Sequence, residues 1–350
     1  MLKRLVAVII LLVLVVIAVV FFRGKTVTVT PAPNPIAFIG ISTPVSVVAD
    51  GPHGVKRFRA IVEQNGQSKV AFEDLSKSKQ TRRQFKFDLG KNNVPFLQEG
   101  SAKVTLEAAS NDFRGASTRQ SFDVQVILKK PSVSADGFQH YINQGGAELV
   151  TFDITGTWSE AGVKLPGYNG LSYPMPGQPD NSNHRFSLFP FSWDLAADQV
   201  PVVYVKNAAG DQSTSPFWTK VFPKNFHESR IELSDRLINK ILNDVDPDGK
   251  IPGDAITRYL YLNREIRKQN TQQLFDMRLK SEHRMLWSGA FVRPAAKTES
   301  YFADRRSYIY NGKKVDEEVH LAFDLASTKH MRVSAPNSGK VIWADRLGIY

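Results

Sequence analysis

The chain has 350 residues, a formal net charge of +11 and no cysteine. Its length predicts two or three domains, and the absence of cysteine excludes a disulfide scaffold, a cysteine nucleophile, an iron–sulfur cluster and a thiolate zinc site. Residues 1–25 carry four basic residues and no acidic one, and the remaining charge is spread over the chain, so we expect no nucleic-acid partner.

An apolar segment opens the chain. Residues 5–22 form an unbroken run of 18 apolar or small residues after Lys3 and Arg4. As a helix, such a run is about 27 Å long, close to the thickness of the hydrocarbon core of a membrane. It ends in bulky residues and Arg23, a poor cleavage site. We predict an uncleaved signal anchor over residues 1–24 in the inner (cytoplasmic) membrane, with the C-terminal part in the periplasm or extracytoplasmic space. A cleaved signal peptide is the alternative.

Short β-prone runs dominate the next two hundred residues or so. Residues 25–35 are rich in threonine and proline, which predicts a linker. Beyond it, β runs alternate with turn residues, and a pattern of strand, polar turn and Ser-Thr recurs. This predicts a mainly β fold with two immunoglobulin-like (Ig-like) β-sandwich domains, 36–130 and 131–223. The clearest runs are residues 45–48, 84–87, 104–106, 122–128, 149–154 and 202–205.

Residues 224–294 form a segment with helical periodicity. Apolar residues from Leu233 to Val245 fall on one helical face, and Ser229 and Glu232 have the spacing of a capping box at its start. A second helix is predicted near Asp254 and a third from Thr271 to Leu286.

An acidic motif lies between the first two predicted helices. Asp244, Asp246, Asp248 and Gly249 have the spacing of the start of a calcium loop, but its twelfth position is Ala255, which cannot ligate a metal. We therefore predict a polar turn between helices.

The candidate chemistry lies in residues 295–350, where β character returns at 315–324 and 340–344. None of the common zincin, serine hydrolase, dinucleotide-binding or Walker motifs occurs. His320 and Asp324 form an H-x-x-x-D pair, and an imidazole with a carboxylate suits Zn²⁺. The element SYFADRR (300–306) precedes the pair, and VSAPNSGKV (333–341) follows it.

This ordered set resembles the lysostaphin/LytM-type zinc metallopeptidases, in which S-x-F-G-x-R precedes H-x-G-x-D-L-A and a V-x-A-x-x-x-G-x-V hairpin follows. The resemblance implies the start of a β-sheet peptidase domain in 295–350. It further implies Zn²⁺ as cofactor, peptidoglycan as partner, His320 and Asp324 as the first two zinc ligands, and hydrolysis of the peptide cross-links of bacterial peptidoglycan.

The sequence departs from the family in two ways. Ala303 and Ala322 replace family glycines, and no H-x-H motif follows Asp324, although the family takes its third zinc ligand and a catalytic histidine from that motif. The chain stops at Tyr350, where the resemblance predicts the strand leading to H-x-H. We therefore expect an inactive, truncated form of an endopeptidase, with no catalytic residue in the chain present. One alternative is a non-catalytic envelope protein that binds cell wall or regulates another hydrolase, and another is an Ig-like adhesive ectodomain.

Overall fold

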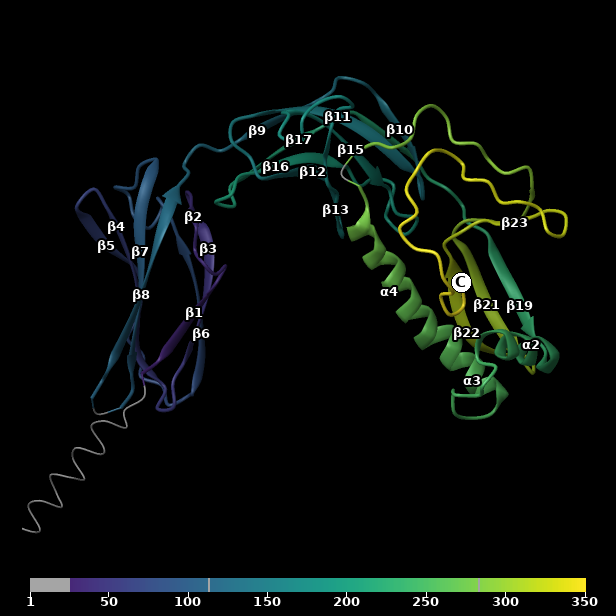
Figure 1. The fold of residues 1–350 in the computed structure, drawn as a ribbon, viewed down its shortest axis with the longest axis horizontal. Coiled ribbons are helices and arrows are strands. Elements are labelled where there is room, and N and C mark those ends of the chain that lie inside the picture. The colour runs from purple at the N-terminus through teal and green to yellow at the C-terminus, as the bar shows by residue number, and fades with distance from the viewer. Residues whose placement is uncertain (1–25, 113, 283) are drawn as a thin grey trace, which may run out of the picture. The chain divides into compact units, whose positions relative to one another are not determined.

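The computed structural model describes residues 26–350 except residues 113 and 283 (Figure 1). The predicted signal anchor therefore lies outside the described residues. Within the described part of the chain, no helix is both long enough and apolar enough to cross a membrane. The fold is mainly β, as predicted. It divides into two compact units: the first comprises residues up to 135, 152–162 and 202–216, and the second comprises 136–151, 163–201 and 217–350.

The first β block consists of two sheets, with strand orders β1-β3-β6 and β2-β8-β7-β4-β5. Neighbouring strands are antiparallel except for β2 and β8. The strands are β1 (Thr28–Ala32), β2 (Phe38–Ile39), β3 (Thr43–Asp50), β4 (Val55–Gln64), β5 (Gln67–Asp74), β6 (Arg82–Leu89), β7 (Gly100–Ser110) and β8 (Ser117–Val126).

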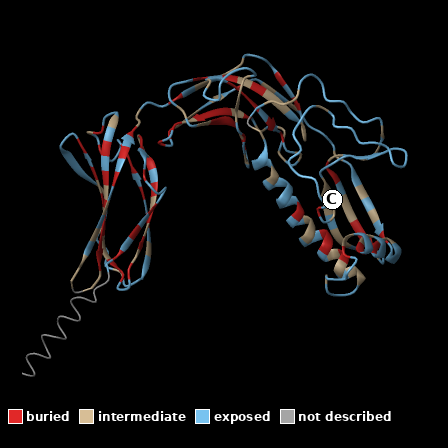
Figure 2. Cartoon of the chain, viewed as in Figure 1, coloured by how far each residue is buried: buried red, intermediate tan, exposed pale blue. Residues whose placement is uncertain are grey.

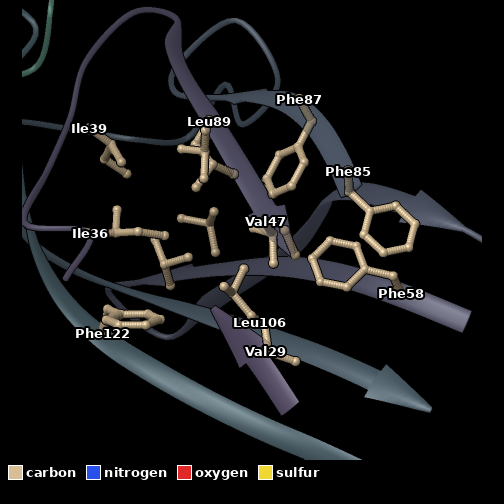
Figure 3. Close-up of a cluster of buried hydrophobic side chains, with 14 of the residues drawn as sticks. Val29, Ile36, Ile39, Val47, Phe58, Phe85, Phe87, Leu89, Leu106 and Phe122 are labelled. Atoms are coloured by element: carbon tan, nitrogen blue, oxygen red, sulfur yellow. The ribbon is translucent and has the colours of Figure 1, made fainter. Parts of the chain in front are cut away.

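Alternating apolar side chains from both sheets form the core of this block (Figures 2 and 3). Phe58 on β4 is fully buried, and its ring stacks on that of Phe85 from β6 with the centroids 4.4 Å apart. A strand buries every second residue, so this packing turns the sequence alternation into two facing apolar layers. The two facing sheets form a β-sandwich, and the mainly β character predicted for this stretch is confirmed.

The expected linker at residues 25–35 is wrong in part. Residues 28–32 form β1, which pairs antiparallel with β3 from Thr28 opposite Asp50 to Ala32 opposite Ser46. Val27 and Val29 are buried in the sandwich core. The threonine and valine alternation therefore outweighs the local proline content, because its apolar face finds a partner sheet.

The second β block contains two four-stranded sheets, ordered β14-β15-β11-β9 and β13-β12-β16-β17, and a two-stranded sheet, β10-β18. The runs predicted at 149–154 and 202–205 lie within β11 and β16. The strands are β9 (Ser132–Ala135), β10 (His140–Asn143), β11 (Ala147–Thr155), β12 (Glu160–Leu165), β13 (Tyr168–Asn169), β14 (Tyr173–Pro174), β15 (His184–Pro190), β16 (Val202–Lys206), β17 (Gln212–Pro216) and β18 (Thr219–Phe222).

The region predicted as helical begins with a strand, β19 (Glu228–Leu233), so the capping box proposed at Ser229 and Glu232 is wrong. The N-cap of helix α2 (Asp235–Val245) is Ser234, whose hydroxyl accepts a hydrogen bond from the Leu237 amide. The helix near Asp254 is confirmed, since Asp254 caps α3 (Ala255–Tyr261). Ile238 and Leu242 of α2 and Tyr259 of α3 are buried in one shared hydrophobic core.

The third helix differs from its prediction at both ends. Helical backbone runs from α3 through the π-helical turn η1 (Leu262–Ile266) into α4 (Arg267–Met277) and the 3-10 turn η2 (Arg278–Lys280). No glycine or proline interrupts residues 255–280. Helical backbone therefore already precedes Thr271, the residue at which the third helix was predicted to begin. It ends before Leu286 because Ser281 adopts an extended conformation.

The C-terminal region contains a three-stranded sheet, β19-β21-β22, and a two-stranded sheet, β20-β23. β19 pairs in parallel with β21, so the strand before the helices and the strands after them belong to one sheet. The strand expected at 340–344 is wrong: residues 327–350, all of them described, contain no strand, and Val341 is exposed without a partner strand. The strands are β20 (Lys297–Ser300), β21 (Asp304–Tyr310), β22 (Lys313–His320) and β23 (Asp324–Ala326).

Candidate functional site

The hairpin of β21 and β22 positions the histidine of the candidate site. His320 is the last residue of β22 and lies opposite Asp304, the first residue of β21. The amide of Ala303 donates a hydrogen bond to the His320 carbonyl over 2.7 Å, which fixes the backbone there. β23 begins four residues later at Asp324. The short connection brings the carboxylate back toward the imidazole.

The structure brings the two sequence-predicted ligands together. His320 Nε2 lies 3.3 Å from Asp324 Oδ1, with side-chain exposures of 15% and 53%. Nε2 is buried and makes no hydrogen bond to any described residue. A buried polar nitrogen that makes no hydrogen bond is unusual in a folded protein.

The electrostatics keep both groups in metal-binding form. Burial, followed by the positive charge of Arg306, lowers the pKa of His320 below its ordinary value of 6.5. Burial alone would raise the pKa of Asp324, but a hydrogen bond from Ser300 and the charges of His320 and Arg306 lower it. The imidazole is therefore neutral and the carboxylate ionised at neutral pH, as a zinc ion requires of its ligands.

Arg306 connects the pair to a buried carboxylate. Its Nη2 donates to Asp324 Oδ2 over 3.2 Å, and its Nε donates to Asp304 Oδ2 over 3.2 Å. The Ser229 hydroxyl of β19 donates to Asp304 Oδ1 over 2.8 Å. The sequence comparison used residues 300–306 only as a motif and missed these roles. The alternation of Asp304 and Arg306 on one strand face was the available signal.

A cavity of about 1290 Å³ opens beside the pair. Arg267 and Lys268 of α4 line one wall, and Glu318 and His320 of β22 line another. Burial raises the pKa of Glu318, an effect that Arg267 partly opposes. His320 and Asp324 both line this cavity.

The donor set fits a zinc ion in part. Among the described residues, no group of three histidine or carboxylate side chains could hold a metal. His320 and Asp324 supply two donors of suitable chemistry, whereas a catalytic zinc site uses three protein ligands and a water. A complete site therefore requires a further ligand beyond the described set.

The backbone of Ala303 is glycine-like. It is fully buried and has a φ of +61°, a conformation that L residues avoid. We expect Ala303→Gly to change the free energy of unfolding by less than about 1 kcal/mol, because relief of strain offsets lost methyl burial and greater chain entropy. Ala303→Val should cost about 2–4 kcal/mol through strain and overpacking.

Hydrogen exchange of the β21 and β22 amides measures both variants of Ala303. Equal protection of the valine and glycine variants would contradict a left-handed, tightly packed residue at this position.

The acidic turn at 244–249 is a structural element. The Asp246 carboxylate accepts hydrogen bonds from the amides of Lys250 and Ile251 and from Arg258 Nη2 at 2.7 Å. Its oxygens are therefore engaged by the protein, in agreement with the predicted polar turn.

This network makes a pH-dependent prediction. The hydrogen bond from Arg258, together with those from the Ile251 and Lys250 amides, lowers the pKa of Asp246 from 3.8 against the opposing effect of burial. A depressed carboxyl pKa stabilises the fold above the unfolded-state pKa, and this stabilisation is lost as the pH falls through the folded-state value. We expect Asp246→Asn to destabilise α2 and α3 at pH 7 and the difference from the unmodified protein to shrink below about pH 4.

Hydrogen exchange of the α2 and α3 amides across this pH range tests the Asp246 prediction. Asp248→Asn, in the same turn but exposed, is the matched control. A difference that persists unchanged at pH 3 would contradict the assigned role of Asp246.

Comparison with known proteins leaves the family open. No family model matches the chain, and no curated protein matches it. The fibronectin(III)-like modules of Clostridium thermocellum CbhA share 12% identity over 57% of this chain and 98% of theirs, with a TM-score of 0.30. An I-band fragment from titin shares 12% identity over 56% of this chain and 68% of its own, with a TM-score of 0.22. Likenesses at these scores carry no argument about activity.

Proposed function

We propose that this chain contributes two zinc ligands, His320 and Asp324, to a membrane-anchored endopeptidase that hydrolyses the peptide cross-links of bacterial peptidoglycan. The observation that carries this proposal is the buried Nε2 atom of His320, which makes no hydrogen bond and lies 3.3 Å from Asp324 Oδ1. The glycine-like backbone of Ala303 adds support, because the LytM-type resemblance places a glycine there.

The chain's own residues would perform the holding and orienting tasks. A zinc ion held by these residues would supply Lewis-acid polarisation of the scissile carbonyl and activation of water. His320 offers a neutral imidazole nitrogen, and Asp324 offers a carboxylate oxygen. The cavity beside them can admit a peptide strand, and the β-sandwich domains would serve as spacers from the membrane.

One observation favours a second function. The described residues contain no third ligand for the pair, and the sequence has no H-x-H after Asp324. A two-ligand site would support zinc binding without catalysis. The chain would then be an envelope protein that binds cell wall or regulates another hydrolase.

A digestion assay separates the two functions. Purified peptidoglycan sacculi are incubated with the full chain in detergent, with zinc or with EDTA, and new amino ends at the cross-links are measured by mass spectrometry. Zinc-dependent cleavage would support the endopeptidase. Zinc binding and sacculus binding without cleavage would support the second function, and the absence of both would contradict each proposal.

Genomic DNA provides an independent test. An open frame beyond the codon for Tyr350 that runs into an H-x-H motif would support the endopeptidase. A stop codon directly after Tyr350 would favour the non-catalytic protein.

A further inference from the structure

The strand pair β10 and β18 has one buried face and one outer face. The two strands run parallel, with Tyr141 opposite Lys220 and Asn143 opposite Phe222. Side chains that are aligned across a strand pair lie on the same face, and successive side chains of one strand alternate between faces. Ile142 is only 1% exposed and belongs to the buried face. The residues on either side of it therefore lie on the outer face, together with those aligned with them on β18.

Three aromatic side chains stand on this outer face. Trp218, Tyr141 and Phe222 are 71%, 60% and 42% exposed. Trp218 directly precedes β18, and its carbonyl accepts a hydrogen bond from the His140 amide at 2.8 Å, which holds it beside β10. The rings of Tyr141 and Phe222 stack with their centroids 6.0 Å apart. Single exposed apolar residues are common, whereas a group of them on adjacent strands indicates an interaction surface.

The same face carries positive charge. Lys220 is exposed, and its ammonium lies 5.8 Å from the centroid of the Phe222 ring. Lys224 follows shortly after β18 and is exposed as well. Neither strand contains an aspartate or a glutamate. The carboxylate of Asp136, just before β10, belongs to a side chain that is only 13% exposed and lies 3.0 Å from the imidazole of His140. The charge of the strand pair therefore favours a negatively charged partner.

Exposed aromatic rings and lysine together have the chemistry of a membrane-contacting surface. Tryptophan and tyrosine combine an apolar ring with a polar group, and both accumulate at the level of the lipid headgroups. Lysine lays its apolar stem along apolar surface and keeps its ammonium in the polar layer. Anionic lipids attract lysines that come close to the membrane surface. A bilayer with anionic headgroups satisfies both the apolar and the charged part of this face.

We propose that the outer face of β10 and β18, formed by Tyr141, Trp218, Lys220 and Phe222, docks on an anionic phospholipid bilayer. The three aromatic rings enter the interface between headgroups and acyl chains, and the ammonium of Lys220 lies among the headgroup phosphates. This inference goes beyond the proposed endopeptidase and does not depend on it, because none of these residues belongs to the candidate zinc site.

Quenching of tryptophan fluorescence by brominated lipid tests the docking. The full chain is reconstituted in nanodiscs of brominated phosphatidylcholine, with or without phosphatidylglycerol. Comparison with Trp218→Phe isolates the signal of Trp218 among the five tryptophans, and residues 1–25 contain none. We expect Trp218-dependent quenching in the anionic discs that weakens at high salt, because ions screen the lysine. Absence of this quenching would overturn the proposal, and equal quenching in the neutral discs would overturn the choice of anionic lipid.

Charge variants give the matched control. Lys220→Gln should lower the ratio of docked to undocked chains about fivefold in the anionic discs. Lys250→Gln makes the same change in a side chain that is 80% exposed in the turn after α2, and it should leave the ratio unchanged. Equal effects of the two variants would overturn the role of Lys220. Peptidoglycan sacculi that shield Trp218 from acrylamide, when bilayers do not quench it, would overturn the inference in favour of a glycan partner.

Discussion

Replacing His320 with alanine is expected to lower the zinc affinity of the full chain by more than about 100-fold, beyond the usual cost of losing a group that only orients a ligand. The imidazole supplies one of the two donors that the described residues bring together, and its Nε2 has no hydrogen bond to lose. Burial and Arg306 lower the pKa of His320. Protons therefore compete little with zinc for the unmodified imidazole at pH 7.

Isothermal titration of zinc into the metal-free protein measures the effect of His320→Ala. His53→Ala is the control, because His53 is exposed in the first β-sandwich, remote in sequence from the site. Asp324→Asn should weaken binding in the same direction, since an amide is a poorer ligand than a carboxylate. If His320→Ala and His53→Ala bind zinc with the same Kd, His320 is not a ligand and the proposed function is contradicted.

Replacing Phe58 with alanine is expected to lower the free energy of unfolding of the first β-sandwich by about 3–5 kcal/mol. The ring is fully buried in the core and stacks on Phe85 at a centroid distance of 4.4 Å (Figure 3). It also approaches Phe87 at 5.8 Å. Truncation removes both the transfer free energy and the packing contacts of neighbouring rings, which cannot collapse into the void without moving two sheets.

Hydrogen exchange of the β4 and β7 amides reports the stability of this sandwich within the full chain. Phe138→Ala is a matched control of the same chemical change, because Phe138 is 74% exposed, and it should alter stability by less than about 0.5 kcal/mol. A loss below about 1 kcal/mol for Phe58→Ala would contradict the contribution assigned to this buried ring.

Local sequence patterns predicted strands of the first β-sandwich correctly, but they also predicted a strand at 340–344 that the structure lacks, and they placed helix ends poorly. The runs at 45–48 and 84–87 lie within β3 and β6, because period-two alternation is the signature of a strand with one buried face. Ser229 and Glu232 matched a capping box but lie in β19. A four-residue pattern cannot reveal that a distant strand, β21, is available to pair with this segment.

The sequence by itself determined the mainly β architecture and restricted any metal site to nitrogen and oxygen ligands. The resemblance of its C-terminal motifs singled out His320 and Asp324, and an H-x-x-x-D spacing allowed the two side chains to meet. Only the tertiary structure decided what surrounds them. The parallel pairing of β19 with β21 brings the Ser229 hydroxyl to the Asp304 carboxylate. Arg306 donates hydrogen bonds to both Asp304 and Asp324 and so links this pair to the candidate site. Such pairing depends on burial and on closing a long loop, which no local pattern encodes.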